Sequence, residues 1–310
     1  MKKILSIAVI FIIVFSMFSM LAPQAYATSA GSSEKGILTK EWKYDMRSLY
    51  STIYFGSSPA IANLLGSPDL EIVTGSDEFE NYYPELGHYA WGIWRCFDSQ
   101  GNLLWAKDTG TDESRSSPVI ADINQDGYLE IVGGTTSGWN VEAMNRFGNF
   151  IWTFPWPPTP EAPFLWHSSP AVADIDASIS GLEVVIGNNA YGNVWAFDGD
   201  NSDGINDGIT ATDWWIYGGT EGIHWDVLWV FQTGSNVLSS PALGDVDNDD
   251  QIEVVIGSQD RKVYVLNGIT GALEWSYSTG GGVDSSAAIA NLDGDPYLEV
   301  VIGSSDGKLY

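Results

Sequence analysis

The chain repeats one short segment five times, and this repetition limits its possible folds more than any other feature. The copies are SSPAIANLLGSPDLEIVTGS, SSPVIADINQDGYLEIVGGT, SSPAVADIDASISGLEVVIGN, SSPALGDVDNDDQIEVVIGS and SSAAIANLDGDPYLEVVIGS, and they begin at Ser57, Ser116, Ser168, Ser239 and Ser285. Successive copies begin 46 to 71 residues apart. Such a period predicts an array of supersecondary units, each packing against its neighbours.

Each unit is expected to contain four short strands. The first is the Ser-Ser-Pro segment with its apolar continuation, and the second is the Glu-Val-Val-Ile-Gly segment. The third resembles residues 262–267 (KVYVLN), and the fourth carries a recurring tryptophan, which is Trp105, Trp152, Trp229 or Trp275. Short runs rich in Val, Ile, Tyr and Trp between Gly, Asp and Asn are strand signals. The predicted fold class is therefore all-β, a β-propeller of four-stranded blades. A stacked β-solenoid has shorter coils, and an immunoglobulin-like sandwich does not repeat one motif in this way.

The N-terminal segment has the features of a secretory signal. Lys2 and Lys3 precede an apolar run over 4–21, and Ala-Tyr-Ala at 25–27 is typical of a signal peptidase site. We therefore expect cleavage after Ala27 and a secreted or cell-surface protein, with an uncleaved membrane anchor as the alternative. The expected divisions are a signal peptide over 1–27, a linker over 28–40 and the propeller over 41–310.

Two interpretations of ring closure are open. The chain begins its repeats with a strand that resembles the fourth, around Trp42, and its last residue, Tyr310, falls within a third strand. The N-terminal strand either completes the fifth blade of a closed ring or closes a later blade of a longer protein. The sequence favours the second, because natural chains rarely end within a strand. In either case we expect a monomeric ring.

The net charge and the single cysteine limit the partners and the covalent links that the chain can have. The chain carries 40 Asp and Glu against 13 Lys and Arg, a formal net charge of -27, which disfavours nucleic acid as a partner. Cys96 is the single cysteine, so no internal disulfide can form. It occupies the repeat position of Ala143, Ala196 and Val265, and we expect it to be a small buried hydrophobe.

Acidic side chains recur between the first and second strands. In the second copy, oxygen-bearing side chains stand at positions 1, 3, 5 and 9, with a carbonyl available at position 7: Asp122, Asn124, Asp126, Glu130 and the carbonyl of Tyr128. Gly127 at position 6 permits a sharp turn. Calcium binds six to eight oxygens at about 2.3–2.6 Å, and a loop of this kind can surround it.

Three further copies carry related sets, and these are Asp245, Asp247, Asp249, Gln251 and Glu253; Asn291, Asp293, Asp295, Tyr297 and Glu299; and Asp174, Asp176, Ser178 and Glu183, one residue longer. In the first copy Asn63, Leu65 and Ser67 predict that the metal has been lost. The alternative is that the loops are Asx-turns with solvated carboxylates. Hard oxygen ligands favour Ca²⁺ over zinc or copper.

The repeat resembles known families. The pattern SSPAxAD-x-[DN]-x-D-G-x-x-E-[IV]-V-[IV]-G is similar to the FG-GAP or VCBS repeat of integrin-alpha-type propellers. The half-repeat G-x-V-Y-x-L-N-x-x-T-G-x-x-x-W is similar to the pyrroloquinoline-quinone-type propeller repeat. The resemblance spans about 41–310 and implies a propeller with calcium in its loops. Position 9 is Glu here where the first family has Asp.

Aromatic residues gather in segments that depart from the repeat. We expect a long loop over 76–89, and together with two later loops it would form one aromatic face for a sugar ring, comprising Tyr82, Tyr83, Trp139, Trp156 and Trp166. The alternative is that these rings fill gaps between blades.

No catalytic constellation is recognisable. The three histidines, His88, His167 and His224, lie in insertions, and neither G-x-S-x-G nor H-E-x-x-H occurs. The sequence thus favours an extracellular calcium-binding module for adhesion or binding, with a protein or glycan partner and no membrane span after signal cleavage. A carbohydrate-active enzyme, such as a polysaccharide lyase or hydrolase, is the second hypothesis, and a scaffold or assembly factor is the third.

Overall fold

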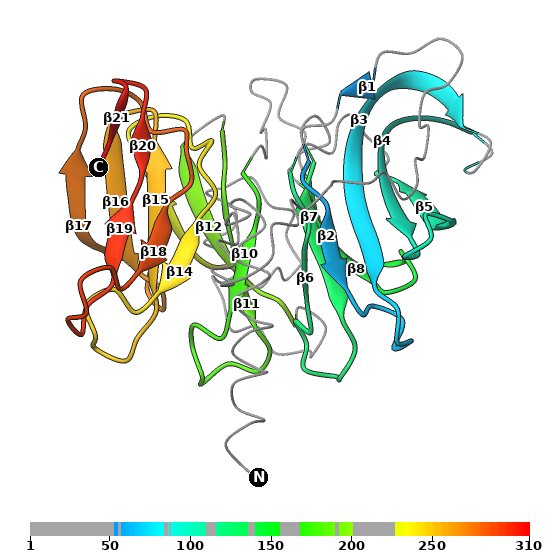
Figure 1. Cartoon of the computed structure of the whole chain (residues 1–310), viewed down its shortest axis with the longest axis horizontal. Coiled ribbons are helices and arrows are strands. Elements are labelled where there is room, and N and C mark those ends of the chain that lie inside the picture. Colours follow the sequence, from blue (N-terminus) through cyan, green and yellow to red (C-terminus); the bar gives the residue numbers. More distant parts are fainter. Residues whose placement is uncertain are drawn as a thin grey trace, which may run out of the picture.

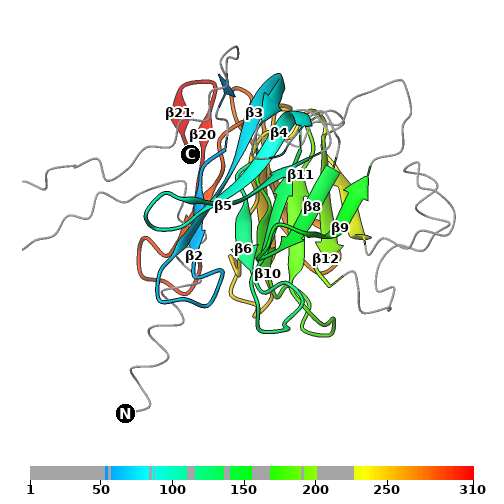
Figure 2. The ribbon, with the colours of Figure 1, turned by 90° about the vertical axis from the view of Figure 1, so that its right-hand side faces the viewer.

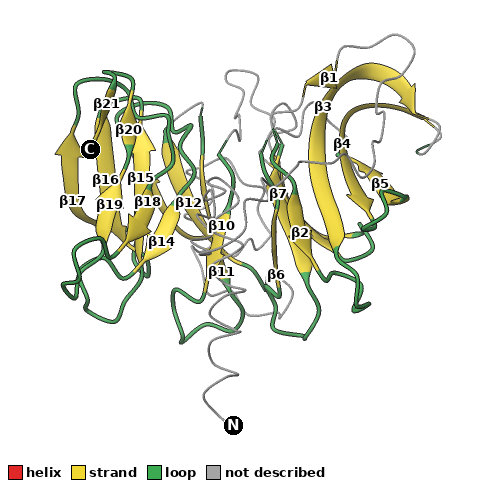
Figure 3. Cartoon of the chain, in the orientation of Figure 1, coloured by secondary structure: helices red, strands yellow, loops and turns green. Residues whose placement is uncertain are grey.

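The chain folds into antiparallel sheets. The computed structural model describes residues 53–54, 57–83, 86, 88–109, 116–135, 140–155, 168–189, 192–200 and 227–310. Every regular element in these ranges is a β-strand (Figure 3), and none of the described residues forms a helix able to cross a membrane. The predicted signal peptide and the strand around Trp42 lie outside the described residues.

Each of the first four repeats forms one sheet, and the fifth forms two two-stranded sheets. The first contains β1 (Ile53–Tyr54), β2 (Ala60–Ala62), β3 (Glu71–Tyr83), β4 (His88–Phe97) and β5 (Leu103–Asp108). The second contains β6 (Val119–Ala121), β7 (Glu130–Gly134), β8 (Asn140–Asn145) and β9 (Phe150–Pro155). The third contains β10 (Ala171–Ala173), β11 (Glu183–Gly187), β12 (Asn193–Asp198) and β13 (Val227–Gln232).

The fourth sheet contains β14 (Ala242–Gly244), β15 (Glu253–Ser258), β16 (Lys262–Asn267) and β17 (Leu273–Ser278). The fifth unit contains β18 (Ala288–Ala290), β19 (Glu299–Val301), β20 (Gly303–Ser304) and β21 (Lys308–Leu309), with β18 paired to β19 and β20 to β21. The prediction of four-stranded blades is confirmed for the second, third and fourth units. The first strands are shorter than expected, because the Ser-Ser-Pro residues precede the strand instead of joining it.

The sheets are arranged as the blades of a propeller. The first strands of consecutive units, β2, β6, β10, β14 and β18, contact one another in that order and lie innermost. Figures 1 and 2 show the sheets following each other around the molecule in sequence order. Because strands alternate in direction, the loops between first and second strands share one edge with the turns between third and fourth strands. That edge is the lower one in Figure 1. The predicted fold class is thus confirmed.

The Ser-Ser pair of the repeat joins neighbouring blades. The second serine accepts a hydrogen bond from the backbone N–H of its counterpart in the preceding unit: Ser117 from Ser58 (2.9 Å), Ser169 from Ser117 (2.9 Å), Ser240 from Ser169 (2.9 Å) and Ser286 from Ser240 (3.0 Å). The first serine binds within its own blade, where the hydroxyls of Ser57, Ser168, Ser239 and Ser285 accept from Gly75, Gly187, Gly257 and Gly303. The motif thus links each blade to the next and holds its own first strand to the second.

The fourth-strand tryptophan makes a second link between blades. Its indole N–H donates to a backbone carbonyl in the next blade: Trp105 to Arg146 (3.1 Å), Trp152 to Gly199 (3.0 Å) and Trp229 to Gly268 (2.6 Å). Gly271 receives the Trp229 ring with a φ of +67°, and a Cβ there would lie 2.5 Å from the ring. Trp275 has the same place in the fourth blade and is 43% exposed.

Cys96 is fully buried, as predicted. It pairs with Val73 in the register that pairs Ala143 with Val132, Ala196 with Val185 and Val265 with Val255. Burial raises the pKa of its thiol to about 12, so the group stays protonated and unreactive at neutral pH.

The prediction of a long loop over 76–89 is wrong. β3 and β4 continue into an extended hairpin, in which Tyr82 pairs with Tyr89 and Tyr83 pairs with His88. The register shifts between Asp77 and Asn81, so an irregularity interrupts the ladder without ending it. The residues that break the repeat pattern therefore lengthen the sheet.

Replacing Trp229 with alanine is expected to lower the free energy of unfolding by about 3–5 kcal/mol, because the change leaves a cavity and an unpaired carbonyl. Trp275→Ala is the matched control in the same strand position and should cost about 1 kcal/mol or less, since that ring is largely exposed. Urea denaturation measures the loss in unfolding free energy of both variants. Equal losses would contradict the proposed link between blades.

Candidate metal centre

A glutamate closes the loop between the first and second strands in every unit. We number these loops first to fifth: 63–71, 122–130, 174–183, 245–253 and 291–299. One carboxylate oxygen accepts from the backbone N–H of position 2, as in Glu71 with Leu64 (2.9 Å), Glu130 with Ile123 (3.1 Å), Glu183 with Ile175 (2.5 Å), Glu253 with Val246 (2.8 Å) and Glu299 with Leu292 (2.6 Å). Glu71 makes this contact in a loop that has no aspartate at positions 1, 3 and 5, so the contact does not depend on metal.

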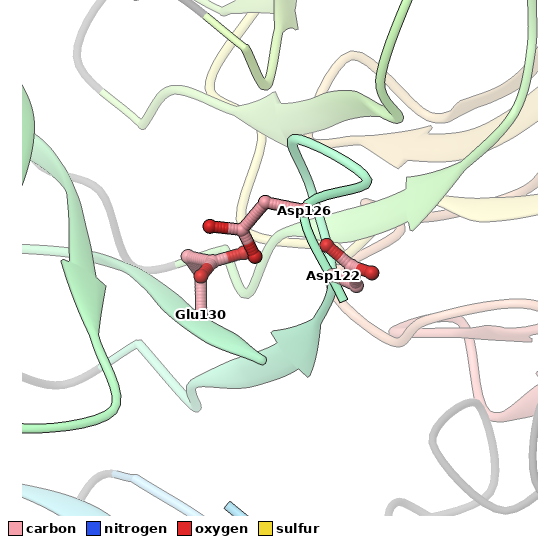
Figure 4. A group of neighbouring side chains, drawn as sticks. All are labelled: Asp122, Asp126 and Glu130. Atoms are coloured by element: carbon pink, nitrogen blue, oxygen red, sulfur yellow. The ribbon is translucent and has the colours of Figure 1, made fainter. Parts of the chain in front are cut away.

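Carboxylates converge in three of the loops. Oxygens within 4.8 Å of one another come from Asp122, Asp126 and Glu130; from Asp245, Asp247 and Glu253; and from Asp293, Asp295 and Glu299. Figure 4 shows the first of these groups, with Asp126 on the loop between Asp122 and the start of β7 at Glu130. Like charges this close repel unless a cation or protons lie between them.

Several carboxylate oxygens at these loops are buried and have no hydrogen-bond partner. They are Asp122 Oδ1, Glu183 Oε1 and Glu253 Oε1. Glu253 is entirely buried, and only its other oxygen is bonded, to the Val246 N–H. Buried polar atoms are nearly always satisfied, so the unpaired oxygens of Asp122 and Glu253, which lie in groups of converging carboxylates, fit the ligands of a cation.

Burial also changes the acidity of the loop glutamates. It raises the pKa of Glu130, Glu183 and Glu253 to about 7, against an ordinary value of 4.5. Neighbouring carboxylates, such as Asp126 beside Glu130, raise it further, while the position 2 hydrogen bonds lower it. A bound cation would favour the ionised form of each group and oppose this effect.

The second and fourth loops have the same backbone shape. Gly127 and Asp250, both at position 6, have φ values of +89° and +68°. Their N–H groups donate to the position 1 aspartate, Asp122 at 3.0 Å and Asp245 at 3.1 Å. Asp250 therefore replaces the glycine without changing the turn, at the cost of a left-handed conformation that disfavours most side chains.

The first and fifth loops close differently. The position 1 residue is asparagine in both, and its side-chain N–H donates to the carbonyl of position 5: Asn63 to Ser67 and Asn291 to Asp295. Pro296 has no N–H and cannot repeat the contact made by Gly127. An amide thus spans the fifth loop at position 1, where the second and fourth loops have an anionic carboxylate, so the position 1 side chain of the fifth loop is neutral and already engaged within the loop.

The third loop does not bring its acidic residues together. Asp176 accepts from the N–H of Ser178 (3.0 Å) and from its hydroxyl (2.6 Å), and Asp174 is exposed. Glu183 binds the backbone of Ile175 and does not join a carboxylate group among the described residues. The additional residue in this loop accounts for the difference, because it lengthens the turn between Asp176 and Glu183.

Other predicted ligands make local contacts. Asn124 accepts from the N–H of Asp126 (3.2 Å), and Gln251 donates twice to Asp249 (2.8 Å each). Tyr128 and Tyr297, whose carbonyls were the predicted ligands, are 52% and 50% exposed. The described geometry thus assembles the carboxylates at positions 1, 5 and 9 of the second loop and at positions 1, 3 and 9 of the fourth.

Most of the predicted aromatic face lies outside the described residues. Trp139, Trp156 and Trp166 are outside them. Tyr82 and Tyr83 lie in β3, where the structure describes their backbone but not their side chains. Sequence reasoning missed a different aromatic group on the loop edge, around Arg146. The sequence signal for it was Arg146 close to Phe147 and Phe150 in a strongly acidic chain.

The comparisons with known proteins bear on the fold. The crystal structures of the exotype rhamnogalacturonan lyase YesX and of rhamnogalacturonan lyase YesW superimpose with TM-scores of 0.52 and 0.53, at 16% and 15% identity. The match covers 82% of this chain in each case, but only 46% and 47% of the lyase chains. A europium-containing methanol dehydrogenase matches 75% of this chain and 48% of its own at 13% identity, with a TM-score of 0.47.

At these identities the likeness to the two lyases concerns the fold alone, and it agrees with the propeller architecture. No protein-family model and no curated protein matches the sequence. The FG-GAP or VCBS resemblance is therefore not confirmed, whereas a propeller of repeats is.

The metal-free protein is expected to lose stability as the pH rises from about 4.5 to about 7. In this window the loop glutamates bind more protons in the folded state, where their pKa is about 7, than in the unfolded state, where it is 4.5. Stability therefore falls as they ionise. The melting temperature in the presence of chelator, measured between about pH 4.5 and pH 7, should fall as the pH rises. A melting temperature that rises with pH would contradict the expected loss of stability.

Proposed function

We propose that the second and fourth loops bind Ca²⁺, that the fifth binds it more weakly, and that the first and third do not bind it. The observation that carries this proposal is the set of converging carboxylates with buried, unpaired oxygens at Asp122 and Glu253. The second and fourth loops have an aspartate at position 1, whereas the first and fifth have an asparagine that closes the loop itself.

The donor set supports a hard cation. The three carboxylate groups of the described residues contain neither histidine nor cysteine. Carboxylate and carbonyl oxygens suit Ca²⁺ and Mg²⁺, and a flexible loop with several carboxylates suits the larger ion. These residues would hold the ion and connect β6 to β7 and β14 to β15, so its role here is structural support of the loop edge.

The wider proposal is an extracellular module for binding or adhesion. A rigid ring of blades with metal-ordered loops presents a stable surface to a glycan or protein partner, and a net charge of -27 opposes nucleic acid. Two structural relatives with TM-scores above 0.5 are rhamnogalacturonan lyases, which keeps a carbohydrate-active enzyme as the alternative. Turnover of a polysaccharide by the purified chain would favour that alternative, whereas affinity without turnover supports the module.

Exchanging the position 1 residues tests the metal proposal. Asp245→Asn should lower the calcium affinity of the fourth loop by about tenfold or more, because it removes one anionic ligand. Asn291→Asp, the reciprocal variant, should raise the affinity of the fifth loop. Calorimetric titration of the chelated protein with calcium resolves the number of tight sites and the change in each variant.

Thermal stability provides the second measurement. Calcium at a hundredfold excess over its dissociation constant stabilises the folded state by about 2.7 kcal/mol for each site. The wild type should therefore melt at a higher temperature with calcium than with chelator, and Asp245→Asn should lose part of that difference. A melting temperature unaffected by calcium or chelator in both proteins would refute the proposal.

A further inference from the structure

A stacked arginine stands on the loop edge of the second blade. The Arg146 guanidinium lies 3.7 Å from the centre of the Tyr128 ring and 4.9 Å from that of Phe147. Tyr128 is position 7 of the second loop, and Arg146 and Phe147 form the turn between β8 and β9. The rings are 52% and 56% exposed, so each also offers surface to solvent.

The guanidinium has donors to spare. Among the described residues it makes no hydrogen bond and no ion pair, and it has five N–H donors in a planar fork. Its charge does act on Glu130, where it opposes the rise in the pKa of that carboxyl group. Stacking occupies only its flat face and leaves its edges available. Lys107 lies nearby, with its ammonium 4.9 Å from the centre of the Phe150 ring at the start of β9. Two of the 13 cationic side chains of a strongly acidic chain thus lie over aromatic rings of one hairpin.

The backbone of this turn is held in place. The Asn145 side-chain carbonyl accepts from the N–H groups of Phe147 (3.0 Å) and Asn149 (3.1 Å). The Arg146 carbonyl accepts from the Trp105 indole of the first blade (3.1 Å). The Tyr128 N–H donates to Asp126 (2.8 Å), which fixes the ring beside the carboxylates of the second loop. The surface is therefore organised before any ligand arrives, which lowers the entropic cost of binding.

We propose that Arg146, Tyr128 and Phe147 form a binding site for an acidic polysaccharide, one whose sugar rings carry carboxylates. Exposed aromatic rings suit the C–H faces of pyranoses, and the guanidinium edge suits a carboxylate in bidentate geometry. The net charge of -27 opposes polyanions in general, so recognition of an acidic glycan would depend on the local cations Arg146 and Lys107 and on contacts between the sugar faces and the rings, which a phosphate backbone does not offer. A calcium ion in the adjacent second loop would offer a further contact for the same anionic groups. The inference rests on the proposed function, since it identifies the ligand class of the extracellular module.

The experiment measures binding of oligogalacturonate, oligoglucuronate and oligomannuronate, each beside its methyl-esterified form, to the calcium-loaded chain. At least one free acid should bind, and its ester should bind about tenfold more weakly or worse, because the charge-assisted contact is lost. Arg146→Gln and Phe147→Ala should each weaken binding by a similar factor. Arg146→Gln should fold normally, because the link to Trp105 uses the backbone of Arg146 and not its side chain.

Two matched controls lie elsewhere on the chain. Arg261→Gln removes an exposed arginine from the turn between β15 and β16 at the opposite edge, and Tyr277→Ala removes an exposed tyrosine of β17 that lies in no proposed site. Neither should alter binding. Effects of these controls equal to those of Arg146→Gln and Phe147→Ala would overturn the inference.

Three other outcomes also decide the question. If no acid oligosaccharide binds while calorimetry still detects calcium, the inference fails and the metal proposal stands. If calcium itself does not bind, the metal proposal fails, and acid-specific binding lost in Arg146→Gln would still support the site. Binding of poly-L-glutamate as tight as that of the sugars would show that the site recognises charge alone, which overturns the assignment to a glycan.

Discussion

One hydrogen bond, from the position 2 N–H to a glutamate that is buried in the first four units, supports both the fold and the candidate metal centre. It occurs in all five units and ties the end of the first strand to the start of the second. A hydrogen bond to a charged group contributes about 1.5–3 kcal/mol, and losing a buried one costs more. The same carboxylate has a second oxygen, and in Glu253 this oxygen is buried and unpaired. Each glutamate thus uses one oxygen for the backbone of its loop, and the other oxygen is the one proposed to bind the cation where carboxylates converge.

The blades are joined by contacts that repeat with the sequence. The second serine links each innermost segment to the next, and the fourth-strand tryptophan links the outer part of each blade to the turn of its neighbour. Stability in such an array is close to a sum of terms within units and between neighbours. The loop of one blade also touches the next, since Leu182 N–H donates to the Ile123 carbonyl (2.8 Å). Ordering one loop therefore affects the position of the adjacent blade.

The strands and the position of Cys96 could be predicted from sequence, because side-chain periodicity and repeat alignment report local burial directly. The role of Glu71 was missed, although its presence in a loop with no aspartate at positions 1, 3 and 5 was a signal that the glutamate has a structural purpose. The partners of Trp152 and Trp229 could not be predicted, because each indole meets a backbone carbonyl 47 or 39 residues away. The hairpin of β3 and β4 was mistaken for a loop because its residues depart from the repeat.

At the candidate metal centre, too, the sequence pattern did not reveal which hydrogen bonds each loop forms. Sequence spacing placed the second, fourth and fifth loops in one class, and carboxylates do converge in all three. The distinction between aspartate and asparagine at position 1 emerges only when their hydrogen bonds are known. Asp245 accepts from Asp250, whereas Asn291 donates to Asp295 and so closes its own loop. A single atom, an amide nitrogen in place of a carboxylate oxygen, separates the two arrangements.

A crystal structure of the chain grown with calcium, with anomalous scattering to identify the ions, tests the central claim most directly. The account predicts ions in the second and fourth loops, bound by Asp122 and Asp245 and by the oxygens of Glu130 and Glu253 that do not contact the backbone. It predicts none in the first and third loops. Empty second and fourth loops at saturating calcium, with their glutamates unchanged, would contradict it.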